Sequence, residues 1–137
     1  MSFCWVEDPR AEAEGIVLVV DVTRHARQVG FESSTFVSRG LWVRFVGAGP
    51  GQEERLLQTL VAAGHCMSNP SRASYDGTAA LFELRMNEIG LAAEVISVVH
   101  SERNSLVLML RREFDRPFND RPLRVRVVAE DDTRPRA

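Results

Sequence analysis

Alternating apolar and polar positions dominate the second half of the chain. In residues 79–86 (AALFELRM), Phe82, Leu84 and Met86 recur at every second position, opposite a charged face. A period of two is typical of a strand that buries one face and exposes the other. The pattern therefore predicts a strand here, with the three apolar side chains turned into a core.

Four other segments also have the character of strands. Residues 16–20 (IVLVV) are a β-branched run between a glycine and an aspartate, which indicates a short buried strand. Residues 91–100 and 104–114, joined by SERN, predict a β-hairpin. The second of these is apolar on both faces, as expected of a central strand. Residues 123–130 (LRVRVVAE) alternate apolar residues with arginine and predict an edge strand with an arginine stripe.

The clearest helix is predicted over residues 52–67 (QEERLLQTLVAAGHCM). Two glutamates stand in its first turn, where they suit the helix dipole. The polar stretch that follows, SNPSRASYDG, carries Asn-Pro and Asp-Gly turn signals and predicts a loop. The apolar stripe of the helix comprises Leu56, Leu57, Leu60, Val61 and Gly64.

Residues 21–31 (DVTRHARQVGF) predict a short helix of two turns. Asp21 or Thr23 can cap its start, and Gly30 can end it with a positive φ. Helical spacing places Val22, Ala26 and Val29 inward and leaves Arg24, His25, Arg27 and Gln28 on a solvated face.

Residues 34–46 (STFVSRGLWVRFV) fit two structures. Their strand formers indicate a strand. Alternatively, Ser38 caps a helix that begins at Arg39. We favour the helix after Ser38, which would turn Leu41, Trp42 and Phe45 inward.

Helices early in the chain and strands late indicate an α+β fold. We expect an antiparallel sheet of about four to five strands with two or three helices packed on one face. The 137 residues are 45% apolar and 26% charged, which suits one soluble globular domain over residues 1–137. The ends, residues 1–14 and 131–137, are expected to be loosely ordered.

Charge and cysteine content narrow the function classes. The net charge of −2 does not favour general affinity for nucleic acid or an anionic membrane. The N-terminus lacks a signal-peptide pattern, and no apolar run is long enough to span a membrane. Two cysteines are too few for a disulfide framework, so we expect a reduced, cytoplasmic setting without membrane association.

No motif for catalysis or for a cofactor stands out. Cys66 and His65 are neighbours and cannot form a nucleophile–base pair on a helix, although His100 could supply a base from a strand end. The three histidines, including His25, lack zinc-ligand spacing, and GAGPG lacks the lysine of a phosphate-binding loop. We therefore expect no catalytic residue, metal or cofactor. The alternative is a small hydrolase or transferase that uses Cys66 and His100.

The arginines are the main candidates for binding a partner at the surface, because all 17 basic residues are arginine. Each is a permanently charged, planar donor fork that suits carboxylates and phosphates. Interleaved acids, such as Glu113, Asp115 and Asp120, favour a plain solvated surface instead. Two phenylalanines in a polar loop could anchor an interface. The partner-binding candidates are Arg27, Arg39, Arg112, Phe114, Arg116, Phe118, Arg121, Arg124 and Arg126.

Residues 15–42 carry a Gly-x-x-x-x-Val-Asp-Val run, an Ala-Arg-x-x-Gly-Phe segment and a Val-Ser-Arg-x-Leu-Trp segment. These motifs resemble an uncharacterised family of small bacterial proteins, often borne by plasmids and phages and known as a domain of unknown function. EERLLQTLVAA, LFELRMN and LVLML resemble its helix and strands, so the likeness covers most of residues 15–111. The matching positions are Gly15, Val20, Asp21, Val22, Ala26, Arg27, Gly30, Phe31, Val37, Ser38, Arg39, Leu41 and Trp42.

The chain departs from that pattern in places. The family's Ala-Gly-Phe is Val-Gly-Phe here, its threonine is Ser38, and the tryptophan of its middle helix is leucine. The arginine-rich C-terminal segment lies outside the pattern, and no catalytic residue is carried over. The resemblance implies a mobile-element setting, in which genes often act against host defences, for example as inhibitors of CRISPR effectors.

Together these observations predict a non-enzymatic interaction protein encoded by a mobile element. Its expected partner is a host protein or ribonucleoprotein complex, for instance a defence effector that it inhibits or modulates. A nucleic-acid-binding accessory protein is a further alternative, which the net charge does not favour. No pattern in the sequence specifies an oligomeric state.

Overall fold

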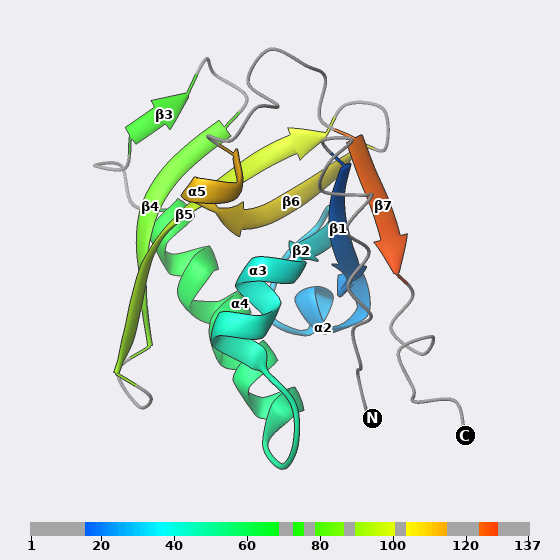
Figure 1. Ribbon diagram of the computed structural model, residues 1–137, viewed down its shortest axis with the longest axis vertical. Helices are drawn as coiled ribbons and strands as arrows, with labels where there is room; N and C mark the ends of the chain where they lie inside the picture. Colours follow the sequence, from blue (N-terminus) through cyan, green and yellow to red (C-terminus); the bar gives the residue numbers. More distant parts are fainter. Residues whose placement is uncertain are drawn as a thin grey trace.

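A computed structural model describes residues 16–68, 73–75, 79–86, 90–100, 104–114 and 124–128. In this part of the chain one seven-stranded sheet, in the order β3-β4-β5-β6-β2-β1-β7, forms the centre of the molecule (Figure 1). The strands are β1 (Ile16–Asp21), β2 (Ser34–Ser38), β3 (Ala73–Tyr75), β4 (Ala79–Met86), β5 (Leu91–His100), β6 (Ser105–Leu110) and β7 (Arg124–Val128).

The α+β class is confirmed, but the sheet is larger than predicted and mixed. β4, β5 and β6 form the expected antiparallel succession, whereas β2 pairs parallel to β6 and β1 pairs parallel to β7. Parallel neighbours arise because these pairs join segments far apart in the chain rather than the arms of a hairpin. The predicted loop after the long helix also contains β3, which is too short to show alternation. The predicted loose ends lie outside the described residues.

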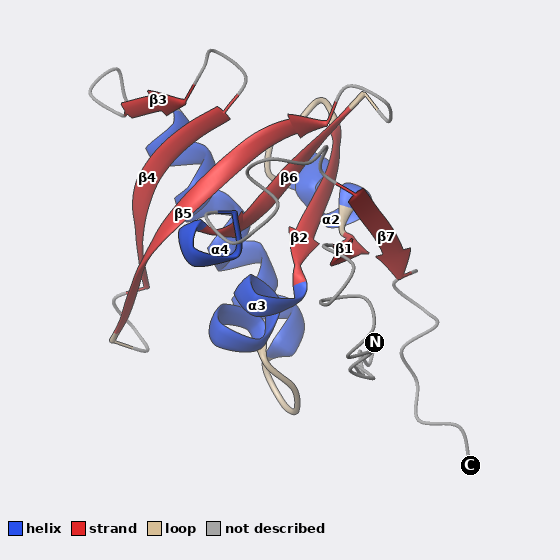
Figure 2. Ribbon diagram, turned by 45° about the horizontal axis from the view of Figure 1, so that its top comes forward, coloured by secondary structure: helices blue, strands red, loops and turns tan. Residues whose placement is uncertain are grey.

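Five helical segments of the described ranges accompany the sheet. The segments α2, α3, η1 and α4 contribute to one core, and α5 follows β6. Figure 2 shows the helices in blue beside the red strands of the sheet. None of the helices in the described ranges has the length and apolar character needed to cross a membrane. The segments are α2 (Thr23–Gln28), α3 (Arg39–Leu41), the π-helix η1 (Trp42–Val46), α4 (Gln52–Met67) and α5 (Arg111–Phe114).

The sheet has buried apolar side chains on both faces, as β6 shows. Leu106, Leu108 and Leu110 belong to the core that the helices cover. Val107 and Met109 alternate with them and belong to a second cluster on the opposite face. The prediction of a central strand is therefore confirmed. The predicted strand over residues 104–114 was too long, however, because helix α5 begins directly after Leu110.

Both interpretations of residues 34–46 are partly correct. The segment is a strand up to Ser38, and a helix begins at Arg39. The Ser38 hydroxyl caps that helix by accepting a hydrogen bond from the Leu41 amide at 3.2 Å. Trp42 and Phe45 are buried as predicted. From Trp42 onward the helix widens into η1, and such π-turns are frequent at functional sites.

Helix α2 begins and ends almost as predicted, but the side chain of His25 does not lie on the predicted solvated face. The Asp21 carboxylate accepts a hydrogen bond from the Thr23 amide at 3.0 Å, and Gly30 has a φ of +102°. The prediction that His25 is solvated is wrong, because its side chain is fully buried. Its Nε2 atom lies 3.2 Å from Oε1 of Glu53 on α4. Helix α2 packs against both β2 and α4, so it buries more than one apolar stripe.

Helix α4 spans the predicted residues, although its buried face is narrower than expected. Leu56, Leu60 and Ala63 are buried, as is Thr59 between them. Val61 is 41% exposed, so its predicted place in the apolar stripe is wrong. The buried residues Leu56, Leu60 and Ala63 recur at helical spacing and form one line along the helix.

Candidate functional site: an arginine-lined groove

The candidate site lies where β6 ends beside β5. Pairing between β5 and β6 runs from His100↔Ser105 to Val95↔Leu110. Pairing between β5 and β4 continues four residues further, to Leu91. The hairpin of β4 and β5 therefore extends past the end of β6, as Figure 1 shows at its lower left.

The surface beside this extension is hollowed. The groove has a volume of about 380 Å³ and is open to solvent. Three parts of the chain form it, namely η1, β5 and the junction of β6 with α5, and η1 lies far from the other two in the sequence. The residues that line this arginine groove are Arg44, Ala93, Glu94, Leu110, Arg111 and Arg112.

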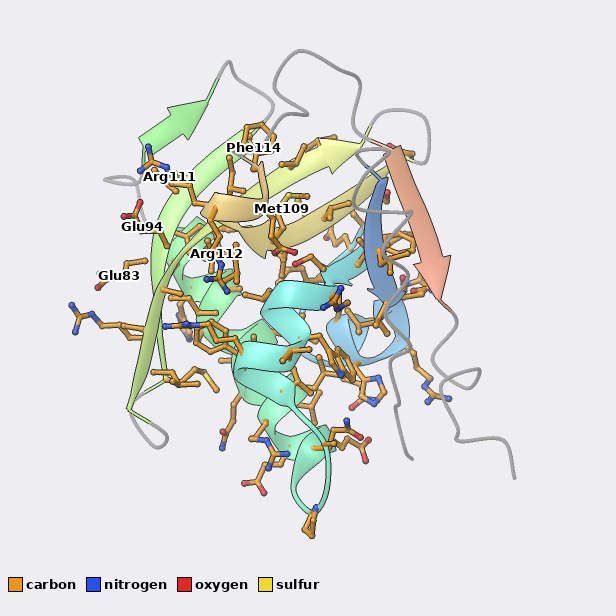
Figure 3. All side chains as sticks on the ribbon, in the orientation of Figure 1. Glu83, Glu94, Met109, Arg111, Arg112 and Phe114 are labelled. Carbon is orange, nitrogen blue, oxygen red and sulfur yellow. The ribbon has the colours of Figure 1, made fainter. Side chains whose placement is uncertain are left out.

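Two of the three arginines form hydrogen bonds with other residues of the chain. Nη1 of Arg111 donates to Oε2 of Glu94 at 2.7 Å, and Nη2 of Arg44 donates to the Ala92 carbonyl at 3.0 Å. Arg112 is exposed, and none of the described residues forms a hydrogen bond or ion pair with its guanidinium. In Figure 3, Arg111 and Arg112 leave α5 in different directions. Three cations facing one carboxylate give the groove a net positive charge.

Glu113 lies between these arginines and the body of the protein. Its carboxylate accepts hydrogen bonds from the Ser38 hydroxyl at 2.6 Å, the Gly40 amide at 3.2 Å and the Leu110 amide at 2.9 Å. These contacts fasten α5 to the end of β2 and the start of α3. The sequence suggested that Glu113 would offset the neighbouring arginines at the surface. In the structure it turns inward and does not line the groove.

The structure brings together only part of the predicted binding set. Arg112 lines the groove, whereas exposed Arg27 on α2 and half-buried Arg39 on α3 do not. Phe114 is half-buried and packs against the second core cluster, so it is not the free surface anchor that the sequence suggested. Arg116, Phe118 and Arg121, together with the side chains of Arg124 and Arg126 on β7, lie outside the described residues.

The predicted set also missed three charged members of the groove, Arg44, Glu94 and Arg111. Arg44 lies in a segment whose structure was ambiguous, and its direction depends on the π-turn. Glu94 lies in a strand whose outer face looks like any solvated face. No local pattern could reveal that these residues meet, because β5 and η1 come together only through tertiary packing.

The geometry does not support pairing of Cys66 with His100. Cys66 Sγ donates to the Glu83 carbonyl at 3.4 Å, and Glu83 is the register partner of Glu94 on β5. His100 lies six residues further along that strand, roughly 20 Å away at the usual rise of a strand. Burial, and secondarily the charge of Glu83, raises the pKa of the Cys66 thiol. Both features disfavour a nucleophilic thiolate.

A second hollow of about 370 Å³ lies between the end of α2 and the C-terminal half of α4. Val29, Phe31, Val61 and Met67 give it a largely apolar lining, to which His65 adds one titratable group. Among the described residues, no three His, Cys, Asp or Glu side chains are grouped to hold a metal ion. The arginine groove is therefore the stronger candidate for recognition of a charged partner.

Comparisons of the chain with protein-family models, with curated proteins and with solved structures gave no match.

Proposed function

We propose that this chain is a non-enzymatic interaction protein that binds an acidic surface of another macromolecule through the arginine groove. The observation that carries the proposal is the convergence of Arg44, Arg111 and Arg112 from η1 and α5 on one hollow. In the mobile-element setting implied by the sequence resemblance, the partner is a host protein or ribonucleoprotein complex. A CRISPR or other defence effector, inhibited or modulated by binding, is the example that this setting suggests.

The groove has the chemistry that such recognition needs. Guanidinium groups bind carboxylates through two parallel hydrogen bonds, and these bonds strengthen when a partner excludes water. A hydrogen bond to a charged group contributes about 1.5–3 kcal/mol, against about 0–1 kcal/mol for an exposed ion pair. Arg112 is already exposed at the groove, and within the described ranges it has no hydrogen bond or ion pair that must first be broken. It should therefore contribute most to partner binding.

The competing functions have weaker support. The enzyme alternative requires a reactive Cys66, whose thiol pKa is raised rather than lowered. The nucleic-acid alternative could use the same arginines on phosphates. It would require strong positive charge over a longer surface, whereas this groove also contains Glu94 and the chain carries a net charge of −2.

The test begins with affinity capture of the partner from the host, identified by mass spectrometry. The dissociation constant of the purified partner is then measured for the wild-type protein, for Arg112→Glu and for Arg27→Glu. Both variants make the same charge change at an exposed arginine, but only Arg112 lines the groove. We expect Arg112→Glu to weaken binding at least about tenfold, or about 1.4 kcal/mol, with little change for Arg27→Glu. Equal effects of the two variants would contradict the groove as the binding site.

A further inference from the structure

The arginine groove contains a backbone edge beside which the described residues place no strand. In Leu91–Glu94, β5 pairs with β4 on one side. On its other side, the pairing with β6 stops at Val95↔Leu110, and the described part of the chain supplies no strand in its place. Ala93 and Glu94 of this stretch line the groove. An unpaired strand edge is a ready template for another extended segment.

The direction of the backbone groups fits this role. The Ala92 carbonyl accepts from Nη2 of Arg44 at 3.0 Å, so it points away from β4 and toward the groove side. Successive residues of a strand alternate in the side to which their amide and carbonyl groups point. The backbone groups of Glu94 therefore point to the same side as those of Ala92. Arg44 covers this edge in the isolated protein, as charged side chains commonly do at open edges.

We infer that this edge accepts an extended acidic segment of a partner protein, which adds as a strand beside β5 in line with β6. The inference rests on the proposed function and adds the conformation and the charge of the ligand. Main-chain hydrogen bonds to Ala92 and Glu94 hold the segment, and its alternate side chains meet the arginines. The four residues of the open edge accommodate a motif about 13 Å long.

Charge complementarity identifies the occupant as acidic. Arg44 approaches the open edge from η1, while Arg111 and Arg112 approach from α5. Carboxylates at every second position of the added strand all face one side, so an alternating acidic segment presents a row of carboxylates to the arginines on that side. Arg44 then exchanges the Ala92 carbonyl for a carboxylate of the ligand, and this exchange uncovers the edge for pairing.

Synthetic peptides can test this inference without knowledge of the partner. The probe is a fluorescein-labelled octapeptide of alternating glutamate and valine, and binding is followed by fluorescence anisotropy. Two further peptides of the same sequence carry N-methyl groups on either set of alternate residues. N-methylation removes amide donors on one edge of the added strand and leaves the charge unchanged. A lysine–valine octapeptide and a single-stranded oligonucleotide of eight nucleotides complete the set.

We expect the glutamate–valine peptide to bind, one N-methylated peptide to lose at least about tenfold in affinity and the other to bind normally. The backbone amide signals of Ala92 and Glu94 should shift on binding, and Arg112→Glu should weaken it.

If both N-methylated peptides bind like the parent while Arg112→Glu still weakens binding, strand addition is wrong, but the charged groove remains the binding site. Tighter binding of the oligonucleotide overturns the choice of an acidic peptide. If no peptide binds but Arg112→Glu still weakens the captured partner, the inference fails and the proposed function survives.

Discussion

Ser38 and Glu113 lie 75 residues apart in the sequence, and the Ser38 hydroxyl donates to Glu113 Oε1 at 2.6 Å. The same hydroxyl accepts from the Leu41 amide and so caps α3. One serine therefore connects the helix that leads into η1 with the helix that carries Arg111 and Arg112. The relative positions of the three groove arginines depend on this contact.

Replacing Glu113 with glutamine should destabilise the fold by about 1.5–3 kcal/mol, because three donors converge on its carboxylate. A glutamine side chain has a single acceptor oxygen and presents two donors where acceptors are needed. Chemical denaturation measures the loss. The control is Glu94→Gln, which breaks the exposed pair with Arg111 and should cost less than about 1 kcal/mol. A similar small cost for both variants would show that Glu113 does not fasten α5.

Alanine at two helical glycines should have opposite effects. A Cβ on Gly40 would lie 2.7 Å from the Glu113 carboxylate and would force it away from its three donors. A Cβ on Gly64, inside α4, would lie 3.5 Å from the Phe31 ring, which is ordinary contact. We expect Gly40→Ala to lower the melting temperature. Gly64→Ala should raise stability by about 0.5–1 kcal/mol through helix propensity alone. A stabilising Gly40→Ala would contradict the close approach of Glu113.

His25→Ala should cost about 2–4 kcal/mol, because it leaves a cavity under α2 where the buried ring packs. The matched control is Arg27→Ala on the same helix, where an exposed side chain is removed and the change should stay within about 0.5 kcal/mol. Urea denaturation of both variants provides the comparison. Equal, small effects would mean that His25 is solvated, as its place in the sequence first suggested.

Cys66 should react slowly with iodoacetamide at neutral pH. Burial and the nearby Glu83 raise the pKa of its thiol, so less thiolate is present than for a free cysteine. Cys4→Ser leaves Cys66 as the single thiol of the chain, so the reaction rate can be assigned to it. A rate above that of free cysteine would reopen the enzyme alternative.

The same pKa shift fixes the sign of a pH effect on stability. The folded chain holds the Cys66 proton to higher pH than the unfolded chain does. This thiol therefore favours folding below the ordinary thiol pKa, and its contribution is lost as the pH rises through the raised value. Denaturation of the Cys4→Ser protein should show a decline in stability in alkaline solution. The additional change Cys66→Ala should reduce that decline.

The sequence predicted the elements with local patterns well. The alternation around Phe82 and Leu84, the stripe through Leu56 and Leu60, and the cap at Ser38 all correspond to observed structure. These features depend on neighbours two to four residues away, which is the range that periodicity reports. The exact end of β6 and the parallel pairs depend on distant partners, so no local pattern could reveal them.

The candidate site was harder to predict for the same reason. Arg112 was selected for its chemistry alone, and its place in the groove depends on Glu113 turning inward. From sequence, Glu113 looked like a surface charge that would offset Arg112. The prediction for His25 was wrong in the opposite sense. This residue lies between two arginines on a short helix, yet its side chain is buried where α2 meets α4. In each case the deciding contact joins residues far apart in the chain.

The parallel pairing of β2 with β6 has a consequence for how the protein is made. It matches Ser34 with Ser105, about 70 residues later in the chain. At ordinary rates of translation, β2 leaves the ribosome roughly 4–14 s before its sheet partner is synthesised. Throughout that interval one edge of β2 lacks its partner strand β6. Phe36 and Val37 lie on the two faces of β2. Synthesis speed and chaperone access over this interval should therefore influence the yield of folded protein.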